Sequence, residues 1–402
     1  MSNTKIRDFF HKPFFTSFYT LFGVWMLIPL YAFYKTLRAG GPENTYHTFR
    51  FSFLNALEKI PLYIEHPQEH ADLFLYGPFF SAFIAPFASL PLNVGYLLWL
   101  IFIVMVLYVT IRTSTFSRSV QIFMLWFCAN EMLTCTLVVQ FNGVIAALII
   151  FAFVAVEKER DEWATLAIVI GTFIKVYGIV ALPFFFFSKH KKRFIISFAI
   201  WSIILFIAPL AFTSFDYLIS QYHEWFYALT HKNELNIHSW DQNISFLGIV
   251  RRWTGCTTYS DLWLIVPGLI LMALCFFRIP QWKSLQFRYM TLASIMMFAT
   301  LFSTGTESYG HIISLVAVVI WYTSAPWKRN NWDMALLVLS FVLTSLCTTD
   351  IYPQYIRKTY IFPYTLKALP ITLIWFKLCY EMLTRNYLTT EPEAECIKYN
   401  DK

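Results

Sequence analysis

The sequence predicts an all-α protein that is embedded in a membrane and crosses it many times. Of its 402 residues, 57% are hydrophobic and only 14% are charged, whereas soluble domains carry about 25% charged residues. Aromatic residues make up 20% of the chain. This composition excludes a disordered chain, a soluble enzyme and a nucleic-acid-binding domain, and it favours an integral membrane protein built from helices.

Apolar runs recur along almost the whole chain and define the expected membrane spans. A helix needs about 20 mostly apolar residues to cross a bilayer, and several of the runs are shorter than that, so we expect about 12 spans, within a range of 10 to 13 that the same runs allow. The runs are Phe14–Tyr34, Pro78–Leu90, Val94–Ile111, Val120–Leu133, Val138–Val156, Ala164–Phe187, Phe194–Phe212, Leu262–Phe277, Tyr289–Phe302, His311–Tyr322, Met334–Cys347 and Leu366–Met382.

The distribution of charge predicts the orientation of these spans. The net charge is +7, and basic residues concentrate in short connections, as they do in cytoplasmic loops. Lys5, Arg7 and Lys12 precede the first run and place the N-terminus in the cytoplasm. The clearest cytoplasmic loops are Lys189–Arg193, Arg278–Arg288 and Trp327–Arg329, whereas the mixed charges of Arg112–Arg118 and Glu157–Glu162 are ambiguous.

This topology predicts one membrane domain over residues 1–388 with two long extracytoplasmic loops. The first loop, residues 35–76, contains an amphipathic segment around Phe49–Lys59 that is typical of a helix lying on a membrane surface. The second loop, residues 214–261, is also rich in acidic, histidine and aromatic residues. Residues 389–402 form a polar tail, which we expect in the cytoplasm.

Two ionisable residues inside apolar runs indicate a polar pocket or pathway, because a charge at the bilayer centre costs at least ~2.5 kcal/mol. Lys175 lies near Gly171, Gly178 and Pro183, which favours a broken helix lining a cavity. Glu131 fits a functional role and a position near a helix end equally well. These two residues also leave open a transporter or lipid flippase with Lys175 and Glu131 in its substrate path.

The sequence gives no sign of a metal or another cofactor. Its seven cysteines include no CxxC pair and have no regular spacing, which indicates neither a disulfide framework nor a zinc site. The first external loop contains no DxD-like pair of acids. We therefore predict no metal and no cofactor.

Several stretches together resemble the GT-C polytopic glycosyltransferases, specifically the polyprenyl-phosphate-mannose-dependent group, glycosyltransferase family 87. The resemblance lies in the order and spacing of these stretches and covers most of residues 14–325. They are PLYIEHPQEHADLFLYGPFFSAFIAPFASLP, VVQFNGVIAALIIFAFVAV, GTFIKVYGIVALPFFFFSKHKKR, NISFLGIVRRW and STGTESYGHIISLVAVVIWY.

The resemblance implies a GT-C-like bundle that moves a sugar with inversion from a polyprenyl-phosphate donor to a glycolipid or glycan acceptor. It implies a hexosyltransferase in the cytoplasmic membrane of a bacterium, acting at the outer face. A carboxylate of the first external loop then serves as general base. The family usually carries Asp about twenty residues before the Leu62–Tyr63 pair, where this chain has Asn44, whose amide cannot act as a base. Asp72 is the preferred replacement and Glu43 the second, because Glu43 would point elsewhere on a helix.

The resemblance also implies ligands for the donor phosphate and the rest of the substrate. Cationic and amide side chains suit a departing phosphate. The candidates are Lys175, His238, Asn243, Arg251, Arg252, Gln140, Asn142 and Glu307.

Three alternatives to this transferase remain open from the sequence. The transporter or flippase is one, although long external loops argue against it. A membrane ligase or polymerase of the O-antigen type is another, but arginines should then dominate the long loop, which has Arg251 and Arg252 only at its end. A scaffold without chemistry is the third, because of Asn44.

Overall fold

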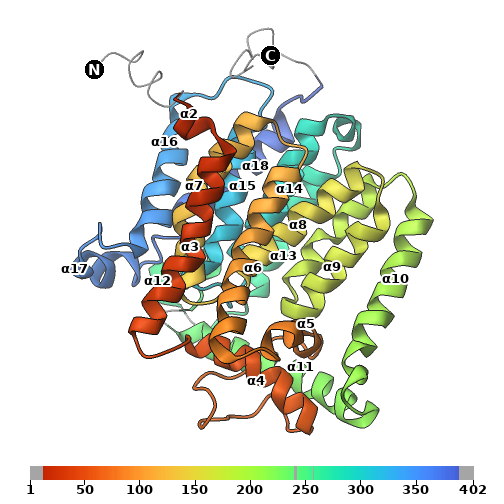
Figure 1. Ribbon diagram of the computed structural model, residues 1–402. Coiled ribbons are helices and arrows are strands. Elements are labelled where there is room, and N and C mark those ends of the chain that lie inside the picture. The colour runs from red at the N-terminus through yellow and green to blue at the C-terminus, as the bar shows by residue number, and fades with distance from the viewer. Residues whose placement is uncertain (1–11, 240–241, 257, 389–402) are drawn as a thin grey trace.

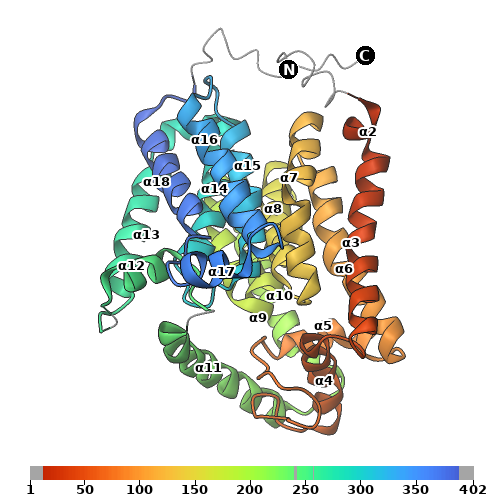
Figure 2. The same ribbon diagram turned by 90° about the vertical axis from the view of Figure 1, so that its left-hand side faces the viewer.

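The computed structural model describes residues 12–239, 242–256 and 258–388, and in these residues it contains helices and no strands. The long helices form an upright bundle, with α2 at one end and α4 and α11 lying across the other (Figures 1 and 2). The all-α class that the composition predicts is therefore confirmed.

Within the residues that the structure describes, five segments are long and apolar enough to cross a membrane by length and composition. They are α3 (Phe18–Arg38), α6 (Leu92–Thr113), α7 (Arg118–Leu137), the segment Lys191–Ala211, which joins α10 (Lys191–Ile207) to η2 (Ala208–Ala211), and the segment Asn331–Thr348, which includes α16 (Asn331–Leu339), η5 (Ser340–Ser345) and η6 (Leu346–Thr348).

The described part of the chain contains five further apolar helical segments of 10–17 residues. They are α5 (Phe79–Ala88), α8 (Asn142–Glu157), η1 (Tyr177–Phe187), α13 (Leu262–Phe276) and the segment Ser308–Thr323, formed by η4 (Ser308–His311) and α15 (Ile312–Thr323). Together with the long spans they make the chain a multi-pass membrane protein, while the number of twelve spans stays a prediction.

The centre of the bundle is apolar, and so is much of its outer surface. α8, α14 (Leu285–Leu301) and α15 pack together in the middle, and every residue of α15 from Ile312 to Trp321 is buried. On the outside, Ile195 and Ile203 of α10 and Leu274 of α13 are more than half exposed. Apolar side chains on both faces are typical of helices that contact a protein core on one side and lipid on the other.

Two helices form a cap over one end of the bundle: α4 (Asn44–Glu58) and α11 (Phe215–His238) (Figure 2). The two parts of the cap are bonded to each other, since the Gln221 side chain accepts from the Leu62 amide at 2.8 Å and the Tyr217 hydroxyl donates to the Ile60 carbonyl at 2.7 Å. The cap therefore holds residues 60–62 against α11.

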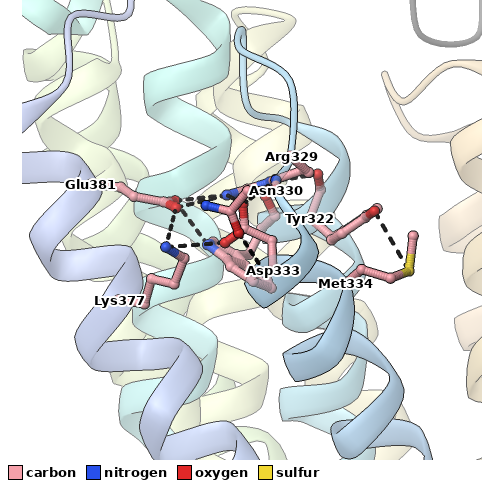
Figure 3. Close-up of polar contacts among 8 residues, drawn as sticks. Tyr322, Arg329, Asn330, Asp333, Met334, Lys377 and Glu381 are labelled. Atoms are coloured by element: carbon pink, nitrogen blue, oxygen red, sulfur yellow. Dashed lines mark hydrogen bonds and ion pairs between the residues drawn. The ribbon is translucent and has the colours of Figure 1, made fainter.

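The other end of the bundle carries the basic loops and a closed cluster of charges. Arg329 donates to Glu381 of α18 (Leu369–Thr384) at 2.8 Å, and Lys377 lies 3.0 Å from Asp333, as Figure 3 shows. Asn330 and Asp333 form a capping box at the start of α16. Two cations and two carboxylates thus neutralise one another and join α16 to α18.

The remaining helical segments are short or connect the others. They are α2 (Pro13–Thr16), α9 (Asp161–Lys175), α12 (Phe246–Thr254), η3 (Ile279–Lys283), α17 (Gln354–Ile356) and η7 (Arg357–Ile361).

Candidate functional site

A cavity of about 570 Å³ lies between the cap and the bundle and brings together residues from distant parts of the sequence. Its walls come from the start of α4, the segment before α5, the turns at α7–α8 and α9–η1, α11, and the segment 303–309. Its charged and amide side chains are Glu43, Asp72, Gln140, Lys175, Lys232, Asn233, Asn236, Gln242 and Glu307.

Lys175 reaches this cavity because its helix ends there. α9 stops at Lys175, and Val176 adopts a positive φ of 42° before η1 begins. Gly171 and Gly178 face each other across this break, where a Cβ on Gly178 would lie 2.4 Å from the Thr172 nitrogen, so a larger residue would not fit there. The glycine pair therefore permits the tight return that places Lys175 in the cavity wall.

The Lys175 ammonium group is held by a neutral partner. Its Nζ donates to Asn142 Oδ1 at 2.8 Å and lies 5.6 and 5.8 Å from the ring centroids of Tyr76 and Tyr177. No ion pair joins Lys175 to a carboxylate among the residues that the structure describes. A cation with an amide and two aromatic faces around it is suited to an anionic ligand.

Asp72 also lines the cavity and is held there by Asn44. The Asn44 side chain donates from Nδ2 to Asp72 Oδ2 at 2.6 Å and accepts from the Ala71 amide at Oδ1 at 2.8 Å. Asn44 stands at the position where the family usually carries the Asp that acts as base. In the structure it orients the carboxylate that was the preferred replacement.

His70 supports the same stretch from the other side. Its Nδ1 lies 2.7 Å from the Asp72 carbonyl oxygen, which can only accept, so Nδ1 carries the hydrogen. Burial lowers the pKa of His70 below its usual value, and burial together with the nearby Arg50 charge lowers the pKa of His47. The His70 ring is therefore neutral at pH 7 and donates to the backbone of the residue that it positions.

Two other acids line the cavity. Glu43 is the residue before α4 and lies in the same cavity wall as Asp72, so the expectation that it would point elsewhere on a helix is wrong. Glu307 accepts a hydrogen bond from the Gln242 amide. The cavity thus combines three carboxylates with two lysines.

One face of α11 supplies residues that the sequence analysis missed. Trp225, Leu229, Lys232, Asn233 and Asn236 line the cavity, and their spacing follows one side of a helix. That periodicity was visible in the sequence, whereas the position of the helix over the bundle was not.

Gln140 and Asn142 lie at the turn between α7 and α8. Gln140 lines the cavity, and its side chain accepts a long hydrogen bond of 3.4 Å from the Tyr76 hydroxyl. Asn142 is the first residue of α8 and accepts the hydrogen bond from Lys175, but it does not itself line the cavity. Both predicted residues are therefore close to the Lys175 ammonium group or its aromatic neighbours.

The predicted residues of the second loop have mainly internal partners. Asn243 is buried, has a φ of 55° and accepts from the Ser245 hydroxyl at 2.6 Å in the turn before α12. Arg252 donates to the carbonyls of Ser239, Gln242 and Phe362. Arg252 therefore holds the segment that carries Gln242, whose side chain donates to Glu307.

Arg251 lines a neighbouring cavity and not the first one. It is buried, donates to Asp261 at 2.6 Å and lies 4.5 Å from the Tyr259 ring centroid. This second cavity measures about 500 Å³ and shares Tyr177, Asn233, Ser303 and Thr304 with the first. Most of its other walls are apolar, including Leu262, Ile265 and Phe302. His238 ends α11, and its side chain lies outside the described residues.

Glu131 lies away from the cavity and is paired. Its Oε1 accepts from Lys367 Nζ at 2.8 Å, and both side chains are almost completely buried. Lys175 and Glu131 therefore do not line one path, and nothing in the structure favours a transporter.

No group of three or more His, Cys, Asp or Glu side chains within the described residues is arranged to hold a metal ion. The first cavity is lined by carboxylate, amide, ammonium and hydroxyl groups.

The bundle and its capped, charged cavity define a membrane-embedded protein with a site for a polar ligand at one end. Comparison with known families then identifies the class: the profile of glycosyltransferase family 87 matches residues 74–304, more than half of the chain. The protein belongs to glycosyltransferase family 87 and is a membrane glycosyltransferase. No curated protein matches the chain. The matched region includes Lys175, Gln140 and Asn142 but begins after Asp72.

Proposed function

We propose that the protein transfers mannose from a polyprenyl-phosphate donor to a glycolipid or glycan acceptor at the outer face of a bacterial cytoplasmic membrane. The observation that carries this proposal is the cavity beneath the cap, where Asp72 and Glu43 share the walls with Lys175. Such a transfer needs a base for the acceptor hydroxyl and a cation for the departing phosphate. The cavity contains both kinds of group.

In the proposed reaction, Asp72 takes the proton of the acceptor hydroxyl while the hydroxyl oxygen forms a bond to the anomeric carbon. The bond from that carbon to the phosphate oxygen breaks, and polyprenyl phosphate leaves with the bonding electrons. Attack from the side opposite the phosphate inverts the configuration. Lys175 stabilises the charge that develops on the phosphate, with Lys232 as the second cation.

The contacts of Asp72 favour it over Glu43 as the base. Asn44 occupies one oxygen of the carboxylate through its 2.6 Å bond and leaves Oδ1 for the acceptor. No side chain among the described residues is bonded in this way to Glu43, which precedes the helix. A fixed carboxylate reacts faster than a mobile one because its orientation is paid for by folding.

The adjacent cavity suits the lipid part of the donor. It meets the first cavity at Tyr177 and Ser303, and its apolar walls include Leu262 of α13, which is 61% exposed on the outer surface. We assign the isoprenoid chain to this second cavity, so that the phosphate lies where the two cavities join.

The proposed orientation follows from charge. The basic loops around Lys189–Arg193 and Arg278–Arg288 lie at the end of the bundle opposite the cap, and basic loops remain in the cytoplasm. The cap and its cavity then face outward, and both termini face the cytoplasm.

The test uses purified full-length protein, polyprenyl-phosphate mannose labelled in the sugar, and lipid extract as the acceptor source. We expect the wild type to transfer label, and Asp72→Asn to lower kcat by about 10²–10⁴-fold, the usual contribution of a general base. Glu58→Gln is the matched control, because Glu58 is an exposed acid of α4 that does not line the cavity.

Two outcomes would contradict the proposal at different levels. Full transfer by both Asp72→Asn and Glu43→Gln would contradict the assignment of the general base but not the transferase activity. Failure of the wild type to bind or consume this donor would contradict polyprenyl-phosphate mannose as the donor substrate.

A further inference from the structure

A separate groove opens on the outer surface at the end of the bundle opposite the cap. It measures about 320 Å³ and lies over α8, between α6 and α9. Basic and hydroxyl side chains line one part, and apolar side chains line the rest. The lining residues are Thr110, Thr113, Phe151, Val154, Ala155, Lys158, Arg160 and Trp163.

Three glutamates around this groove pair with basic residues of other segments. Glu157 pairs with Arg288 at 2.7 Å, Glu159 with Lys189 at 2.6 Å, and Glu162 with Arg193. Asp161 is buried, and neither of its carboxylate oxygens has a hydrogen-bond partner among the described residues. The three glutamate contacts direct most of the negative charge of the loop toward other basic segments.

Lys158 and Arg160 are left as the cations of the groove. Neither has an ion-pair partner in the described part of the chain, and the Lys158 side chain makes only a weak hydrogen bond within that part, 3.4 Å from Nζ to the Thr113 carbonyl. Two basic residues thus border the groove without a carboxylate to neutralise them.

The backbone explains how residues so close in sequence separate their charges. α8 ends at Glu157, Glu159 has a positive φ of 58°, and the Arg160 amide donates back to the Ala155 carbonyl at 2.8 Å. This return is the hydrogen-bond pattern of a Schellman helix end. It places Lys158 and Arg160 on the groove, while Glu159 reaches Lys189.

The apolar part of the groove is exposed on the surface of the bundle. Trp163 is 53% exposed and Phe151 is 39% exposed, although both are large hydrophobic side chains. Tryptophan is enriched at the boundary between lipid and water, and Lys158 and Arg160 lie beside it in the same groove. A cationic end joined to an apolar, lipid-facing wall matches a molecule with an anionic head and a hydrocarbon chain.

We propose that this groove binds an anionic phospholipid, with Lys158 and Arg160 on its phosphate and an acyl chain along Phe151 and Trp163. The site is distinct from the cavity beneath the cap and does not depend on the proposed transfer reaction. Its ligand belongs to the surrounding bilayer and is neither donor nor acceptor.

The test measures lipid binding to the delipidated full-length protein in detergent by native mass spectrometry. Phosphatidylglycerol and phosphatidylcholine with the same acyl chains are compared. We expect Lys158→Gln/Arg160→Gln to weaken phosphatidylglycerol binding by about 30-fold, which corresponds to about 2 kcal/mol at about 1.4 kcal/mol per tenfold. Phosphatidylcholine, whose choline cation offsets the charge of its phosphate, should bind more weakly to the wild type and lose less affinity in this variant.

The matched control is Lys192→Gln/Lys328→Gln, which removes two exposed charges outside the groove. We expect it to keep phosphatidylglycerol affinity within about 3-fold, because only the general field changes. Equal losses in the two double variants would overturn the site. Equal binding of both lipids by the wild type, or displacement of phosphatidylglycerol by soluble glycerol phosphate, would also overturn it.

A second measurement does not depend on the folding of the charge variants. Phosphatidylglycerol with brominated acyl chains quenches nearby tryptophan fluorescence. The quenchable signal should be larger in the wild type than in Trp163→Phe, and identical quenching of the two proteins would contradict an acyl chain in the groove.

Discussion

Two lysines of the bundle, Lys367 and Lys175, differ in the partner that each ammonium group has. Lys367 is completely buried and donates to Glu131 at 2.8 Å, so its charge meets an opposite charge. Lys175 donates at the same distance to the neutral amide of Asn142 and borders a cavity. A buried charge costs free energy unless it is paired. The Lys367 pair is therefore part of the fold, whereas Lys175 is available to an anion from outside the protein.

The same contrast separates the two ends of the molecule. At the end with the basic loops, Arg329, Asp333, Lys377 and Glu381 neutralise one another within one cluster (Figure 3). Beneath the cap, the carboxylates and lysines of the cavity are not joined by ion pairs among the described residues. The charges that form ion pairs join helices to one another. The charges of the cavity that form no ion pair are the ones that we expect to contact a ligand.

The largest expected effect comes from breaking the compensated pair. Lys367→Met leaves the Glu131 carboxylate buried without a partner, which typically costs about 3–5 kcal/mol. We expect a strongly lowered melting temperature in detergent, measured by scanning fluorimetry. Glu131→Leu/Lys367→Met removes both charges and should recover most of the loss, so a double variant as unstable as the single one would contradict this interpretation of the pair.

The next effect tests the uncompensated lysine. Lys175→Met removes a cation that stabilises the departing phosphate, and loss of one such group costs about 10²–10³-fold in kcat. The melting temperature should stay close to that of the wild type, because no carboxylate loses its partner. Lys175→Arg keeps the charge and should retain part of the activity. A large loss of stability with unchanged kcat would reverse the comparison with Lys367.

Local signals in the sequence predicted one side of this comparison. Gly171, Gly178 and Pro183 lie within a few residues of Lys175 and indicated a broken helix, and α9 does end at Lys175. The all-α class and the membrane setting followed from composition. These features depend on residues that are neighbours along the chain.

Long-range pairing was beyond the reach of a single sequence. Glu131 and Lys367 are 236 residues apart, and no local pattern in the sequence connects them. Arg252 is one of the candidates for the donor phosphate, and the sequence did not reveal its bonds to the carbonyls of Ser239, Gln242 and Phe362. Asn44 was interpreted as a lost base, because its partner Asp72 is 28 residues away.

Asn44 offers a smaller and more specific perturbation of the uncompensated cavity. Asn44→Asp replaces the hydrogen bond to Asp72 with a contact between two carboxylates, and such a pair shares a proton, which raises one pKa. The acid limb of the pH profile of kcat/KM should therefore move to higher pH. Asn44→Ala should lower kcat by about 10–100-fold through loss of a hydrogen bond to a charged group. Unchanged pH profiles and rates in both variants would mean that Asn44 does not position the base.

The smallest expected effect concerns the pH response of the cap at His70. Burial is the main cause of its lowered pKa, with His66 acting in the same direction and Glu69 and Asp72 opposing it. The unfolded segment, with a histidine pKa of about 6.5, therefore binds more protons than the folded one, so the stability of the cap falls as the pH decreases below about 6.5 and is fully present above it. Hydrogen exchange of residues 66–72, corrected for intrinsic rates, should therefore become faster as the pH is lowered from about 7 to about 5.5. His70→Asn keeps a donor for the Asp72 carbonyl without the titration and should reduce that increase, whereas His223→Asn, at an exposed position of α11, should not. Equal pH dependence in all three proteins would show that protonation of His70 does not control the cap.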